Sequence, residues 1–224
     1  MRPALVSEFV GTAGLLAGVV GSGIMAEQLT NDVGLQLLQN ALATAGVLIA
    51  LILALQTSSG AHFNPAVTLA ARMSGELNTR AAVLYMAAQL AGAVVGTMIA
   101  NLMFDLAPVE LSTKDRSGAH LLFAEFIATL GLVSVIHGVV RSGRAHMAAY
   151  AVGAYIAGAY YFTASTSFAN PAVTVARSLT DTFSGIHPSS VLPFIAVQIL
   201  GAMGAVQLMR ATHPLPIHGH DREG

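Results

Sequence analysis

Residues 64–68 read Asn64-Pro65-Ala66-Val67-Thr68, and the same five letters recur as Asn170-Pro171-Ala172-Val173-Thr174. Proline lacks a backbone N–H and has a fixed φ, so it suits the first position of a helix, and asparagine is a common N-cap in front of it. Each copy therefore predicts the start of a helix. Arg72 and Arg177 follow soon after the two copies. Both predicted helices are thus too short to cross a bilayer.

The composition is that of a membrane protein. Of the 224 residues, 54% are hydrophobic and 9% are charged, whereas about a quarter of the residues in a soluble domain are charged. The formal net charge is -1, which leaves no basic face for nucleic acid. Cysteine is absent, which excludes thiolate metal sites and thiol nucleophiles. We expect lipid as a partner, and no nucleic acid, metal or cofactor.

Uncharged stretches of the chain predict six membrane spans. A spanning helix needs about 20 mostly apolar residues. Single spans fit Phe9–Ala26, Ala81–Phe104, Ala119–Val140 and Thr182–Met209. The stretches Val33–Ala71 and Ala145–Ala176 are longer than one span, and the extra residues of each contain Asn-Pro-Ala. Polar residues precede both motifs, and irregular backbone at membrane depth is tolerated only where protein or water covers it. The extra residues therefore predict two re-entrant half-helices beside an aqueous path.

The two motifs belong to an internal repeat. Glu8 and Gln89 flank the first motif, and Glu125 and Gln198 flank the second in the same order. A duplicated half-protein explains this order, and three spans per half make the second half inverted. We predict an all-α membrane protein with six transmembrane helices and two half-helices. The repeats cover about 4–104 and 119–210, within one channel domain (1–210) that is followed by a flexible cytoplasmic tail (211–224).

The positions of the basic residues predict the orientation. With a cytoplasmic N-terminus, seven arginines lie inside, and Lys114, Arg116 and Arg177 lie outside. Because cytoplasmic loops carry an excess of Lys and Arg, both termini are expected in the cytoplasm.

Inverted symmetry brings the N-termini of the half-helices together near the midplane, so both positive dipole ends point at the centre. Asn64 and Asn170 each have an amide that can cap its helix and still donate toward the lumen. This arrangement favours neutral hydrogen-bonding solutes and opposes cations and protons.

The chain resembles the aquaporin (major intrinsic protein) family over essentially its whole length. The resemblance is carried by both Asn-Pro-Ala motifs, the lead-in Gly60-Ala61-His62-Phe63, and the paired Glu and Gln residues. It implies six spans, two half-helices, one pore per subunit and a homotetramer.

The resemblance also places four selectivity-filter positions, by spacing from the two asparagines, at Thr44, Gly158, Ser167 and Val173. Water channels of the family usually have Phe, His, a small residue and Arg there. All four residues are small in this chain and the Arg is missing, so we expect a wide, uncharged filter that passes solutes larger than water.

A similar filter pattern occurs in bacterial aquaglyceroporins associated with arsenic resistance. That similarity implies a bacterial inner-membrane channel for glycerol-sized polyols and for metalloid acids such as arsenous acid or methylated arsenicals. The short connection 180–191 is instead like that of the water channels, so a water-selective aquaporin is an alternative. A secondary transporter with broken helices is a second alternative. An enzyme is not expected, because no Lys or Asp lies inside a predicted span.

Four further residues have expected roles. Glu8 and Glu125 are expected to accept backbone hydrogen bonds from the loops before the half-helices, rather than to carry protons. His62 is expected beside the pore. For Arg177 two interpretations remain open: it lines the outer vestibule and attracts anionic solutes, or it pairs with Asp181 four residues on.

Overall fold

The computed structural model describes residues 1–212; residues 213–224, which hold most of the predicted tail, lie outside the described part. Within residues 1–212 every regular element is helical, which confirms the all-α class. The elements are α1 (Arg2–Leu29), α2 (Val33–Ser59), α3 (Pro65–Met73), α4 (Thr79–Met103), α5 (Ala119–Arg141), the 3₁₀ turn η1 (Ala145–Met147), α6 (Ala148–Phe162), α7 (Pro171–Arg177) and α8 (Pro188–Thr212).

Five of these helices, α1, α2, α4, α5 and α8, are long and apolar enough to cross a membrane. The sixth predicted span, α6, has 15 residues and is about 23 Å long, against a hydrocarbon core of about 30 Å. It ends early because the chain becomes extended at Thr163, where the segment leading into α7 begins. The last span also differs from the prediction, since α8 starts at Pro188 instead of residue 182 and includes Ala211 and Thr212.

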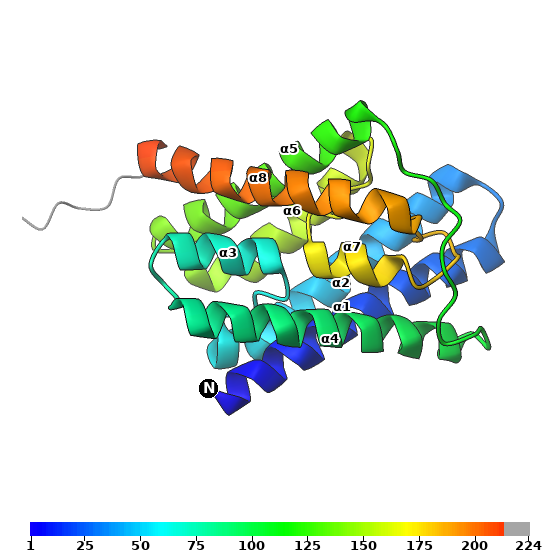
Figure 1. The fold of residues 1–224 in the computed structure, drawn as a ribbon, viewed down its shortest axis with the longest axis horizontal. Helices are drawn as coiled ribbons and strands as arrows, with labels where there is room; N and C mark the ends of the chain where they lie inside the picture. The colour runs from blue at the N-terminus through cyan, green and yellow to red at the C-terminus, as the bar shows by residue number, and fades with distance from the viewer. Residues whose placement is uncertain (213–224) are drawn as a thin grey trace, which may run out of the picture.

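The helices are arranged as two similar halves. In the first half α1 packs on α2 and α4, and in the second half α5 packs on α6 and α8. The half-helices α3 and α7 begin in the middle of the molecule and run toward opposite ends, as Figure 1 shows. The N-terminus and the last described turn of α8 lie at the same end (Figure 1). The arrangement is that of an inverted repeat.

Glycines allow the closest helix contacts in both halves. A Cβ added to Gly96 on α4 would overlap the backbone of Ala13 on α1. In the second half, a Cβ on Gly201 of α8 would press on the carbonyl of Phe126 on α5. Small residues let membrane helices approach at backbone distance, where van der Waals contact holds them. These contacts fix the frame within which the half-helices are held.

Candidate channel pore

A cavity of about 460 Å³ lies between the half-helices and the inner faces of α1, α2, α5 and α6. Arg177, at the last residue of α7, lines one end of it. Arg141 and His146, next to the turn between α5 and α6, line the other end. We refer to these as the Arg177 end and the His146 end. The cavity therefore extends along the molecule, from the end of α7 at one side to the turn between α5 and α6 at the other.

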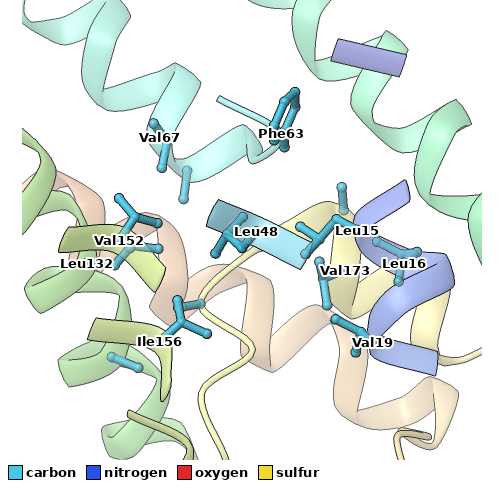
Figure 2. Close-up of a cluster of buried hydrophobic side chains, with 14 of the residues drawn as sticks. Leu15, Leu16, Val19, Leu48, Phe63, Val67, Leu132, Val152, Ile156 and Val173 are labelled. Carbon is cyan, nitrogen blue, oxygen red and sulfur yellow. The ribbon is translucent and has the colours of Figure 1, made fainter. Parts of the chain in front are cut away.

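Apolar side chains line the cavity on two opposite sides. Figure 2 shows side chains that face it from opposite sides, with Leu132, Val152 and Ile156 from α5 and α6, and Leu15, Val19 and Val173 from α1 and α7. Each of these six side chains is at most 7% exposed. These side chains offer no hydrogen bonds, so the polar contacts of the cavity come from the other lining residues, among them Thr44, Asn64 and Asn170.

The two asparagines meet at the centre of the cavity. Asn64 Oδ1 accepts the Ala66 N–H at 2.8 Å, and Asn170 Oδ1 accepts the Ala172 N–H at 3.0 Å, so each side chain caps its own half-helix. Each amide nitrogen also donates across the symmetry axis: Asn64 Nδ2 to the Ala169 carbonyl and Asn170 Nδ2 to the Phe63 carbonyl, both at 2.8 Å. An amide has two N–H groups. One N–H of each asparagine therefore remains for the cavity, which both residues line.

The backbone before each asparagine is strained in the same way. Ala61 and Phe63 have φ of 51° and 49° in the first half, and Ser167 and Ala169 have φ of 52° and 48° in the second. A side chain in this left-handed region costs about 1–3 kcal/mol per residue, so the surrounding structure has to hold it. None of these residues is Gly or Asn, so their sequence contains no signal for the turn.

Glu8 and Glu125 hold these strained segments. Glu8, fully buried, accepts the N–H groups of His62 at 3.0 Å and Phe63 at 2.7 Å. Glu125, also fully buried, accepts those of Phe168 at 2.8 Å and Ala169 at 2.9 Å. The backbone hydrogen bonds expected for these two carboxylates are therefore present.

The paired glutamines complete each network. Gln89 Nε2 donates to Glu8 at 2.7 Å and to Thr68 Oγ1 at 2.9 Å. Gln198 Nε2 donates to Glu125 at 2.6 Å and to Thr174 Oγ1 at 2.9 Å. Each glutamine thus ties a buried carboxylate to the second turn of its half-helix.

His62 lies beside the cavity, as expected, and is held in place. Its Nδ1 is 3.1 Å from Thr68 Oγ1, and its ring meets that of Tyr85 edge to face at 5.6 Å between centroids.

Three of the four predicted filter residues line the cavity, namely Thr44, Ser167 and Val173. Gly158 does not: it is exposed on the outer face of α6, and a Cβ built on it meets nothing within 4 Å. Successive helical residues are 100° apart, so Gly158 lies about 200° around α6 from Ile156, which does line the cavity. The placement of Gly158 in the filter is therefore wrong.

Tyr160 lines the cavity from α6 in place of Gly158. Its hydroxyl is 3.1 Å from Thr44 Oγ1 on α2. The sequence contained a signal for it, because Val152, Ile156 and Tyr160 recur every four residues and so share one helix face. An aromatic side chain is present at this level of the cavity, which corrects the expectation that only small residues occur there.

Arg177 lines the cavity and does not pair with Asp181. Its guanidinium carbon is 3.5 Å from the centre of the Phe168 ring, and its Nε donates to the Ser184 carbonyl. The Asp181 carboxylate instead accepts the backbone N–H of Thr113 at 2.8 Å. The pairing interpretation is therefore wrong. Arg177 is a lining residue, and its attraction for anionic solutes stays a prediction.

Charged groups outside the spans surround both ends of the cavity. The hydrogen bond from the Thr113 N–H lowers the pKa of Asp181. Burial lowers the pKa of Lys114, whose Nζ donates to the Phe183 carbonyl at 2.9 Å. At the other end, burial raises the pKa of Glu76, which lines the cavity, against an opposing effect of Arg141.

Comparisons with known proteins agree with this geometry. The family described as "MIP: Major intrinsic protein" matches residues 1–157. The aquaglyceroporin AqpS of Rhizobium meliloti (strain 1021) is 50% identical over 205 residues, covering 92% of this chain and 88% of that protein. Aquaporin NIP1-4 of Oryza sativa subsp. japonica is 36% identical over 62% of this chain and 53% of its own length.

A solved structure shares the fold. The X-ray structure of the aquaglyceroporin from Plasmodium falciparum superposes with a TM-score of 0.72, covers 96% of both chains and is 20% identical. Six spanning or near-spanning helices, two opposed half-helices and the matching family together lead to one conclusion. The chain is an integral membrane protein that belongs to the major intrinsic protein family of channels.

Proposed function

We propose that the protein is a passive channel of aquaglyceroporin type for small uncharged solutes: water, glycerol-sized polyols, and metalloid acids such as arsenous acid or methylated arsenicals. The observation that carries the proposal is Val173. It occupies the third residue of α7, points into the cavity and is 5% exposed. The family's water channels usually have an arginine there, which narrows the lumen.

Beside the aromatic Tyr160, two small lining residues offer hydroxyl groups to a solute larger than water. Thr44 and Ser167, both small and hydroxylated, line the same cavity as Val173, and no hydrogen-bond partner is present for Ser167 Oγ within residues 1–212. A polyol or an arsenous acid molecule presents several hydroxyl groups, which such side chains can bind. AqpS, which is 50% identical to this chain over 205 residues, is by its name an aquaglyceroporin.

The experiment is stopped-flow light scattering of proteoliposomes under inward gradients of arsenous acid, glycerol and an impermeant osmolyte. Wild type should reswell rapidly in arsenous acid and glycerol. Val173→Arg should abolish reswelling while water flux continues, and Val173→Thr, which keeps the volume of valine, should behave as wild type. Fast water flux without solute entry in wild type would make the protein a water-selective aquaporin. Saturation at low solute concentration, or dependence on a proton or sodium gradient, would favour a secondary transporter.

We also propose that residues 1–210 form one channel domain in a bacterial plasma membrane, with both termini in the cytoplasm, and that four copies assemble. The excess of arginine on one side and the location of both ends of the described chain at the same end of the molecule (Figure 1) support the orientation. Reporter fusions at each terminus test it. Native mass spectrometry in detergent tests the tetramer, which a dominant monomer would refute.

A further inference from the structure

Arg177 is a cation in an otherwise neutral part of the cavity. It ends α7 and is 2% exposed, yet it lines the cavity together with Val173. The sequence predicts an uncharged filter because Val173 replaces the expected arginine. The structure places a guanidinium on the same half-helix, one turn further along.

The Arg177 side chain is directed back along the half-helix toward the filter. Helical side chains lean toward the N-terminus of their helix, and the guanidinium of Arg177 stacks at 3.5 Å on the ring of Phe168, which precedes α7. The bond from its Nε to the Ser184 carbonyl fixes the plane of the group. The charge therefore lies beside Phe168, displaced from the Arg177 backbone toward the N-terminal end of α7.

The remaining donors of Arg177 face the cavity. A guanidinium has five N–H groups, and within residues 1–212 the Nε group alone has a hydrogen-bond partner. The two Nη atoms have no hydrogen-bond partner there, but they are not among the fully buried unpaired atoms. Both Nη atoms are therefore in contact with the open space that Arg177 lines. A buried charge without such partners is costly, so water or solute oxygen atoms have to supply them.

A second guanidinium strengthens the local positive potential. Arg116 lies 4.9 Å from the centre of the same Phe168 ring. Its Nε donates to the Gly185 carbonyl at 2.9 Å, and it is not among the lining residues. Arg116 thus holds the loop in place, and Arg177 presents its charge to the lumen.

We infer that Arg177 is the selectivity-determining cation of this pore: it donates hydrogen bonds to passing solute oxygens and excludes protons and metal cations, a task to which Val173 contributes nothing. The inference rests on the proposed channel function. It predicts a filter that is wide because of Val173 and still impermeable to cations because of Arg177, since a fixed positive charge in a narrow pore repels cations.

The test measures two fluxes in the same proteoliposomes: glycerol entry by light scattering, and proton entry by an internal pH-sensitive dye under an imposed membrane potential. Wild type should pass glycerol with a proton flux close to that of empty liposomes. Arg177→Gln, whose amide can still donate to Ser184, should retain glycerol entry and raise the proton flux about tenfold or more. Arg177→Lys should remain proton-tight, and Arg210→Gln, at the opposite end of the molecule, should match wild type.

The outcomes distinguish the role of Arg177 as a cation barrier from the channel function itself. Glycerol entry in Arg177→Gln with an unchanged proton flux would overturn the role of Arg177 and leave the channel function intact. Absence of glycerol entry in wild type would overturn the proposed function itself. A wild-type pore that passes protons readily would also overturn the role of Arg177, because no effective cation barrier would then exist.

Discussion

Replacing Glu8 by Gln tests whether the buried carboxylate holds the strained lead-in of α3. The side chain is fully buried and accepts four hydrogen bonds, from Ser59 Oγ at 2.6 Å, the His62 N–H, the Phe63 N–H and Gln89 Nε2. Glutamine has the same shape, but one of its terminal atoms is a donor. In the least costly arrangement that NH₂ faces Ser59, whose hydroxyl can turn and accept, and only the His62 N–H loses its acceptor.

The expected loss follows from these contacts. One unpaired buried N–H costs about 1–3 kcal/mol, and each of the remaining bonds weakens by about 1 kcal/mol when the acceptor becomes neutral. The lower desolvation cost of an amide offsets part of this, which leaves about 2–4 kcal/mol. For a chain of this size that corresponds to a Tm about 5–15 °C lower. Glu125→Gln should cost at least as much, because its partners are two backbone N–H groups and Gln198, with no hydroxyl able to turn.

The assay is thermal unfolding of the detergent-solubilised protein followed by circular dichroism, together with glycerol entry into proteoliposomes. Glu110→Gln is the matched control, because that side chain is exposed in the loop before α5 and should leave Tm unchanged. A fall in Tm of less than about 2 °C in Glu8→Gln would refute the calculation. Normal stability with a raised proton flux would instead assign Glu8 to a proton path.

Three further outcomes are expected. Gly96→Ala should lower Tm by about 5 °C or more in the same assay, because the added methyl group overlaps the backbone of α1 and forces the helices apart; an unchanged Tm would contradict the packing. Tyr160→Phe should change the ratio of glycerol to water permeability by about twofold to tenfold, because it removes the hydroxyl beside Thr44, whereas Gly158→Ala should not; the reverse result would restore Gly158 to the filter. Asp181→Asn should lower Tm by about 1–2 °C at pH 7. Because the pKa of Asp181 is lowered in the folded protein, its stabilising effect is present above the ordinary value of 3.8 and is lost as the pH falls through the lowered value. A difference in Tm that persists at pH 2 would contradict this assignment.

The architecture could be predicted from local features of the chain. The duplicated motif, the lengths of uncharged sequence and the paired Glu and Gln residues led to six spans, two half-helices and an inverted repeat. The Asn-Pro pair marks a helix start, and unpaired backbone groups are costly in lipid. Both features can be recognised within a short stretch of one sequence. The hydrogen bonds of Glu8 and Glu125 were also predictable, because a buried carboxylate needs several donors.

The tertiary structure decided which side chains face the pore. Counting residues back from Asn170 placed Gly158 in the filter, but the segment between them contains strained left-handed residues that carry no sequence signal, so the count could not determine the rotation of α6. Its orientation depends on packing against α2 and α5, and it places Tyr160 on the cavity. The direction of Arg177 likewise depends on Phe168 and on a carbonyl in the following loop. Membrane topology arises from forces local in sequence, whereas pore chemistry depends on contacts between distant segments.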